Sequence, residues 1–181
     1  MMIATAEDVL TFWRAAGEQK WFAKDDAFDA EIRRRFLQTY EAAAGGTLSD
    51  WEATPEGALA LAIVLDQFPR NMFRGDARAF AADMMARAVA DRALARGFDQ
   101  QIPTNERLFF YLPFEHSETM ADQDRCRALF RALGNADQLH WAELHADIIR
   151  RFGRFPHRNA VLGRVTTAEE KAYLEADGFA G

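Results

Sequence analysis

The stretch PEGALALAIVLDQFPRN, residues 55–71, decides the fold class of this chain. Its apolar run, Ala58–Leu65, is eight residues long, and a run of that length suits either a buried strand or a buried helix. We predict a helix, because Thr54 and Pro55 form a helix start, the run contains three Ala, and no partner strand is recognisable elsewhere. A helix that is apolar on nearly every side is surrounded by other helices, so residues 55–68 should lie at the centre of the fold.

Helical patterns extend outward from this segment in both directions. Thr5 with Asp8 and Thr167 with Glu170 have the spacing of capping boxes. Between them, apolar residues recur three or four positions apart, as they do on one face of a helix. These stripes are Val9, Phe12, Trp13 and Ala16; Phe28, Ile32, Phe36 and Tyr40; Phe80, Met84, Ala88 and Val89; Cys126, Leu129, Phe130 and Leu133; and Trp141, His145, Ile148 and Phe152. A second segment that is apolar almost all round, residues 104–112, should also be central.

These patterns predict an all-α fold of about eight antiparallel-packed helices. Connections are short and no linker rich in Pro, Ser or Gly divides the chain, so we expect a single domain over residues 1–181. Each central helix should end at its proline, Pro69 or Pro113, because proline removes a backbone donor. Asp66 would then lie in the last turn of its helix, where the helix dipole disfavours a carboxylate and a cation is needed to offset it.

The composition limits the classes of partner. The net charge is −6 and the pI is about 5.3, which argues against non-specific binding of nucleic acid. Of the 22 basic residues only Lys20, Lys24 and Lys171 are lysines. We interpret this bias mainly as a result of genomic base composition, since Ala is also abundant, but Arg is also the residue suited to bidentate recognition of anions. The longest apolar run is too short to span a membrane.

Cysteine usage and missing motifs limit the chemistry. Cys126 is the sole cysteine, and with no signal-peptide pattern at the start of the chain we expect a soluble, cytoplasmic protein. The motifs GxGxxG, GxxxxGK[ST], GxSxG and CxxC are missing, so the sequence identifies no nucleotide, hydrolase or redox site and names no cofactor. Cys126 and His145 lie on apolar stripes, and we interpret both as core residues.

Two polar turns and one polar pair form the candidate site. LDQFPRN, residues 65–71, and RFPHRN, residues 154–159, each carry Phe-Pro followed by Arg-Asn, the second with one extra residue. Because Arg binds phosphate and carboxylate groups through parallel hydrogen bonds, we predict that the turns are neighbours and that they bind a small anionic ligand. The predicted ligand-binding residues are Asp66, Gln67, Arg70, Asn71, Glu115, His116, Arg154, His157, Arg158 and Asn159.

Other interpretations of these residues stay open. The carboxylates and arginines can form ordinary structural ion pairs, and the basic segment 150–158 can be a solvated face. His116 and His157 together with one carboxylate would complete a two-His, one-carboxylate metal centre. No tight ligand spacing supports such a centre, so we predict no metal site. Glu115 with His116 can also act as an acid/base pair, which leaves open whether the protein is an enzyme.

Five stretches of the sequence resemble a bacterial family named domain of unknown function nine hundred twenty-four, and together they cover essentially the whole chain. The stretches are VLTFW (9–13), WFAKDDAFD (21–29), LDQFPRNMFRG (65–75), YLPFEHSE (111–118) and GRFPHRN (153–159). The resemblance implies a tetratricopeptide-like helical fold and carries over no activity. It supplies an alternative to ligand binding, namely an interaction module without catalytic activity that binds a protein or peptide.

Overall fold

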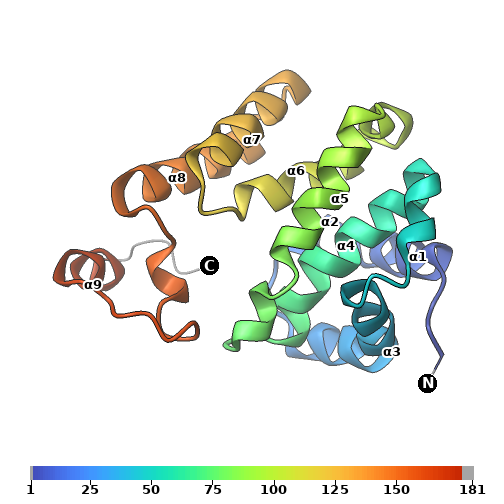
Figure 1. Ribbon diagram of the computed structural model, residues 1–181, viewed down its shortest axis with the longest axis horizontal. Helices are drawn as coiled ribbons and strands as arrows, with labels where there is room; N and C mark the ends of the chain where they lie inside the picture. Colours follow the sequence, from blue (N-terminus) through green and yellow to red (C-terminus); the bar gives the residue numbers. More distant parts are fainter. Residues whose placement is uncertain (1, 177–181) are drawn as a thin grey trace. The chain divides into compact units, whose positions relative to one another are not determined.

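The computed structural model describes residues 2–176, and this part of the chain is built from helices and contains no strand (Figure 1). The α-helices are α1 (Ala6–Ala16), α2 (Glu18–Trp21), α3 (Asp26–Ala44), α4 (Pro55–Met72), α5 (Asp83–Ala95), α6 (Leu108–Glu115), α7 (Met120–Leu133), α8 (Ala136–Phe152) and α9 (Ala168–Glu175). Short 3₁₀ turns are η1 (Ser49–Ala53), η2 (Ala77–Phe80), η3 (Phe98–Gln101), η4 (Thr104–Glu106) and η5 (Pro156–Arg158). The predicted all-α fold of about eight helices is confirmed. None of the described helices is long and apolar enough to cross a membrane.

The chain forms two compact units. The N-terminal unit comprises Met1–Arg74 and Arg78–Pro113, and the C-terminal unit comprises Gly75–Ala77 and Phe114–Gly181. The boundary between them falls within α6. A single domain over residues 1–181 stays a prediction.

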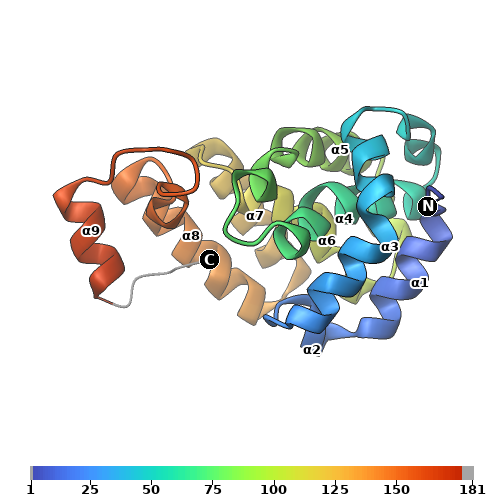
Figure 2. The ribbon, with the colours of Figure 1, turned by 90° about the horizontal axis from the view of Figure 1, so that it is seen from below.

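Helix α4 is the core of the N-terminal unit. Every residue from Gly57 to Pro69 is buried, and α1, α3, α5 and η1 pack around the helix (Figures 1 and 2). A Cβ atom at Gly57 would lie 2.1 Å from the carbonyl oxygen of Trp51, so only glycine lets η1 approach α4 this closely. The predicted central position of residues 55–68 is confirmed.

Stacked and edge-on aromatic rings fill the space beside α4. Trp13 and Trp21 stack with ring centroids 6.0 Å apart, and the Trp21 Nε1–H group donates a 2.8 Å hydrogen bond to the Trp13 carbonyl. Phe68 of α4 contacts Phe36 at 4.9 Å and Trp13 at 5.7 Å. Such ring pairs stabilise a core beyond the area that they bury, which explains the chain's high aromatic content.

The two prolines lie inside helices, and the prediction that they end them is wrong. Helix α4 continues through Pro69 to Met72, and α6 contains Pro113. A proline inside a helix lacks an N–H donor and crowds the carbonyl four residues before it, but the helical bonds resume after it, and the Phe73 N–H group reaches the Pro69 carbonyl at 2.9 Å. Asp66 therefore does not lie in the last turn of α4. The expected helix over residues 104–112 also begins later, at Leu108, after the 3₁₀ turn η4.

Two of the predicted apolar stripes are partly wrong. Met84 is 72% exposed and Ala88 is also exposed, whereas Val89 is buried as predicted and α5 also buries Ala86, Ala90 and Ala93. The reason is that α5 begins at Asp83, whereas Phe80 belongs to η2, so the two segments do not share one helical face. In α8, Trp141 is 47% exposed, and Ala142 takes the buried position beside it.

The C-terminal unit is built on the pair α7 and α8, which lie side by side in Figure 1. The connection is tight because Gly134 adopts a positive φ of 73°, which a residue with a side chain adopts at a cost. Ile148, Ile149 and Phe155 form a buried cluster, and Phe152 and Tyr173 pack against it. Helix α9 lies against η5 (Figure 2), so the end of the described chain covers the second Phe-Pro turn.

Candidate functional site

The first Phe-Pro turn is a closed polar network inside the N-terminal unit. Asp66 is 1% exposed. The Arg70 Nη1 atom lies 3.2 Å from Asp66 Oδ1, and the Arg70 guanidinium donates to both carboxylate oxygens of Asp83 at 3.0 and 3.1 Å. Gln67 Nε2 donates to Asp66 Oδ2 at 2.6 Å. Asp66 is therefore a buried carboxylate, and a cation that pairs with it is Arg70, one turn away on the same helix.

Asn71 continues this network toward α3. Its Nδ2 group donates to Asp29 Oδ1 at 2.7 Å, and the Arg74 guanidinium binds the same carboxylate. Sequence reasoning missed Asp29 and Asp83 as partners. Asp29 ends one of the five family stretches, which is a usable signal, whereas the sequence around Asp83 carries none.

The second Phe-Pro turn is organised around the buried ring of Phe155 in the C-terminal unit. The Arg158 guanidinium carbon lies 4.5 Å from the ring centroid. The rings of His157 and His145 lie 5.6 Å and 5.5 Å from it. Phe155 is fully buried, and Arg158 is only 6% exposed. One phenyl ring thus fixes the positions of three nitrogen-bearing side chains.

A buried polar cluster adjoins this ring. Glu115, at the end of α6, accepts a long contact from Cys126 Sγ at 3.9 Å, and its Oε1 atom lies 3.6 Å from His145 Nδ1. His145 Nδ1 also lies 2.8 Å from the Trp141 carbonyl. All three side chains are buried, which confirms the interpretation of Cys126 and His145 as core residues.

Burial lowers the pKa of His145 to about 3, and the positive charges of His116, Arg158 and His157 act in the same direction. His145 is therefore neutral, and its Nδ1–H group donates to the Trp141 carbonyl. Burial likewise raises the pKa of the Cys126 thiol, and the nearby Glu115 adds to the effect. The thiol stays protonated, so it is not a nucleophile.

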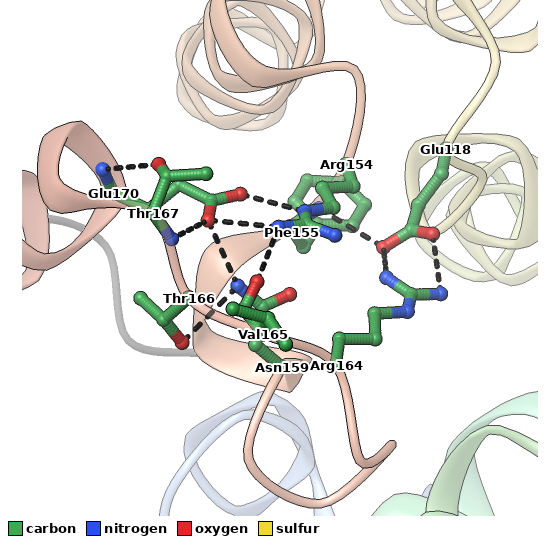
Figure 3. Close-up of polar contacts among 9 residues, drawn as sticks. All are labelled: Glu118, Arg154, Phe155, Asn159, Arg164, Val165, Thr166, Thr167 and Glu170. Atoms are coloured by element: carbon green, nitrogen blue, oxygen red, sulfur yellow. Dashed lines mark hydrogen bonds and ion pairs between the residues drawn. The ribbon is translucent and has the colours of Figure 1, made fainter.

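Arg154 and Asn159 bind a carboxylate of the chain itself (Figure 3). Arg154 Nε donates to Glu170 Oε1 at 2.6 Å, and Nη2 donates to Glu170 Oε2 at 2.9 Å. Asn159 Nδ2 and the Thr167 N–H group donate to the same Oε2 atom at 3.2 and 2.7 Å. The bond with Arg154 is the main cause that lowers the pKa of Glu170 to about 2.

Glu118 fixes the start of the same turn. It accepts hydrogen bonds at 2.8 Å from both Nη atoms of Arg164 and at 2.9 Å from the Phe155 N–H group. Burial opposes ionisation of Glu118, but these donors hold its pKa below the usual range. The sequence did not indicate the roles of Glu118 and Arg164. It also did not indicate that the Glu170 carboxylate binds to Arg154 and Asn159. For Glu170 the capping-box spacing was visible, but that spacing says nothing of Arg154.

The described residues contain no group of three or more His, Cys, Asp or Glu side chains arranged to hold a metal ion. A pocket of about 510 Å³ lies in the N-terminal unit, lined in part by Arg14, Asp50, Trp51 and Glu56. None of the ten predicted residues lines it, and Arg14 binds Glu106 there through two 2.7 Å hydrogen bonds.

Comparison with known proteins identifies the family. A family model described as bacterial protein of unknown function (DUF924) matches residues 9–178. The chain belongs to this family. It is also similar to the solved structure of a protein of unknown function from Agrobacterium tumefaciens, with 50% sequence identity and a TM-score of 0.92 over 94% of this chain and 97% of that chain. No curated protein matches.

In this DUF924 protein the sequence-predicted residues fall into two groups. Asp66, Gln67, Arg70 and Asn71 lie in the N-terminal unit, and the other six lie in the C-terminal unit. Direct contacts join Asp66 with Gln67 and Arg70 in the first group, and Arg154 and Asn159 share the carboxylate of Glu170 in the second. The predicted proximity of the two turns stays a prediction, as does the tetratricopeptide-like arrangement.

Proposed function

We propose that this DUF924 protein binds a small ligand bearing phosphate or carboxylate through the turn at residues 154–159 of the C-terminal unit. The observation that supports it most is the gathering of Arg158 and His157 on the ring of Phe155, at 4.5 and 5.6 Å. Their positions are fixed before a ligand arrives, so little conformational entropy is lost on binding.

The local electrostatics also favour an anion. Burial and the guanidinium of Arg158, which lies at this turn, together lower the pKa of His145, although the chain as a whole carries a net charge of −6. Anions bind best where several donors converge in a partly buried position. Two charged hydrogen bonds contribute roughly 3–6 kcal/mol, which is between about a third and three quarters of the about 8.2 kcal/mol that a micromolar Kd requires.

The test is a comparison of Arg158→Gln with Arg150→Gln. Both changes remove one positive charge, but Arg150 is exposed and pairs with Asp147 on the surface of α8. We expect inorganic phosphate or citrate to stabilise the wild type and Arg150→Gln in a thermal-shift titration, and Arg158→Gln to lose the effect. Equal responses of the two variants would mean that the anion does not bind at this turn.

The alternative is a tetratricopeptide-like interaction module. What favours it is the packing of consecutive helices in pairs, α3 with α4 and α7 with α8, which is typical of such folds. An extended peptide would then be bound by its terminal carboxylate. Capture of a peptide acid but not of its C-terminal amide, with no response to phosphate, would favour this alternative.

We also propose that the protein is cytoplasmic. The support is the sole cysteine, Cys126, which is buried as a free thiol, as expected in a reducing compartment.

A further inference from the structure

The carboxylate of Glu170 is bound as a ligand would be. Four N–H groups from three residues converge on it, and the side chain is almost completely buried, at 2% exposure. Arg154 supplies the fork of two parallel hydrogen bonds that is typical of carboxylate recognition. Figure 3 shows the carboxylate enclosed between Arg154, Asn159 and the backbone of Thr167.

A capping box alone does not require this arrangement. In a capping box, the acidic side chain accepts one hydrogen bond from the backbone of the N-cap residue, which here is Thr167 at 2.7 Å. The contacts of Glu170 with Arg154 and Asn159 come in addition. Both partners belong to the turn for which we predict anion binding, so the chain's own carboxylate fills part of that site.

The contacts that hold Glu170 in place come mainly from polar groups. We call residues 164–175 the C-terminal strap. Within the strap Glu170 is the only buried residue, and Val165 is 85% exposed. Its other attachments include the Arg164–Glu118 ion pair at 2.8 Å, the exposed Arg151–Glu169 ion pair at 2.9 Å, a 2.8 Å hydrogen bond from the Arg164 N–H group to the Asn159 carbonyl, and the contact of Tyr173 with Phe152 at 5.1 Å. A segment with few buried apolar contacts opens locally at a lower cost than the core.

The side chains under the strap would become available when it opens. Within the described residues, the Arg154 side chain bonds only to Glu170 and to the Val165 carbonyl, and the Asn159 amide bonds only to Thr166 and Glu170. All these partners lie on the strap. The Asn159 Oδ1 atom is buried and accepts no hydrogen bond from the described residues, which suits it to accept one from a ligand hydroxyl or amine.

On the basis of the proposed function, we infer that Glu170 is an internal competitor for the anion site. A phosphate or carboxylate ligand displaces it from Arg154 and Asn159, and the strap is released as the ligand binds. The apparent affinity is then the affinity of the open form multiplied by the fraction of molecules in which the strap is open. Ligand binding and exposure of the C-terminal strap are thereby coupled.

Glu170→Gln tests the inference, because glutamine preserves the capping box but lacks the charge that binds Arg154. The matched control is Glu169→Gln, the neighbouring residue, which pairs with Arg151 on the surface at 2.9 Å. Both variants change the net charge equally. In isothermal titration with inorganic phosphate we expect Glu170→Gln to bind about tenfold more tightly than the wild type, and Glu169→Gln to be unchanged. This increase in phosphate affinity should disappear in the double variant Glu170→Gln/Arg154→Gln.

A second measurement needs no variant. Hydrogen exchange of the wild type should become faster at residues 167–175 when phosphate is added, because the strap is released. Equal affinities of Glu170→Gln and Glu169→Gln, or unchanged exchange in phosphate-bound wild type, would overturn the internal-competitor inference while leaving Arg158-dependent binding intact. Failure of all variants to bind phosphate or citrate would overturn both this inference and the proposed function.

Discussion

The two Phe-Pro turns have similar sequences but different structures. In LDQFPRN the proline lies within α4, and Arg70 binds two carboxylates of the N-terminal unit, Asp66 and Asp83. In RFPHRN the proline begins a short 3₁₀ turn, and Arg154 binds Glu170 on the exposed C-terminal strap. Arg70 is therefore part of a folded core, whereas Arg154, which precedes the second Phe-Pro, is held by the strap. The counterpart of Arg70 in the second motif is Arg158, which lies on the buried ring of Phe155 and is 6% exposed. The same motif is structural in one unit and a candidate binding element in the other.

The largest expected loss of stability comes from a buried residue of α4, and we compare it with an exposed residue of the C-terminal strap. Leu61 lies in the middle of α4 at 3% exposure, whereas Val165 of the strap is 85% exposed. Leu61→Ala should cost about 2–5 kcal/mol, and Val165→Ala should change the stability by less than about 0.5 kcal/mol. Urea titration measures both. A loss below about 1 kcal/mol for Leu61→Ala would show that α4 is not the core of its unit.

The second expected effect separates the roles of the arginines. Arg70→Gln removes the cation shared by Asp66 and Asp83, and should lower the free energy of unfolding by about 1.5–3 kcal/mol. Arg154 is more exposed, at 29% against 19% for the Arg70 side chain, so Arg154→Gln should cost less. The measurement is chemical denaturation of both variants under one set of conditions. The reverse order of the two losses would contradict the distinction between a structural and a releasable arginine.

The third prediction concerns pH. The folded-state pKa of Glu170 is lowered to about 2, below the ordinary glutamate value of about 4.3. Because the pKa is lower in the folded state, ionised Glu170 stabilises the fold at pH values above its unfolded-state pKa. This stabilisation is lost as the pH falls toward about 2. The difference in Tm between wild type and Glu170→Gln should therefore narrow as the pH is lowered from about 6 to about 3. A difference that stays constant, or one that Glu169→Gln reproduces, would show that the Arg154–Glu170 pair does not stabilise the strap.

The smallest expected effects come from the two prolines. Pro156 occupies the first position of η5, where proline fits the backbone and restricts the unfolded chain, so Pro156→Ala should cost about 0.4–1 kcal/mol. Pro69 lies inside α4, and alanine there restores an N–H donor at the expense of buried ring contacts. Pro69→Ala should therefore stabilise the protein by up to about 1 kcal/mol. Calorimetry measures the change in Tm of each variant relative to the wild type. Changes of the same sign in both variants would show that the two prolines have equivalent roles.

Local patterns in the sequence determined most of the secondary structure. The capping boxes at Thr5 and Thr167 form as predicted, and the apolar run of α4 is central. These features depend on neighbouring residues, because caps and helical faces are set by spacings of three or four positions. The family could also be recognised, since its motifs are contiguous stretches.

Asp66 pairs with Arg70 at a local spacing of four residues, but the tertiary structure alone decided the more distant carboxylate partners of Arg70 and Arg154. Asp83 lies 13 residues from Arg70, and Glu170 lies 16 residues from Arg154, and no local rule selects one acidic residue among 28. Packing also determined which face of α5 is buried and allowed α4 to continue through Pro69, because tertiary contacts outweigh the local preferences of single residues. The sequence by itself predicted a site at the arginine turns, but ion pairs between distant segments form only where the fold brings their side chains within hydrogen-bonding distance.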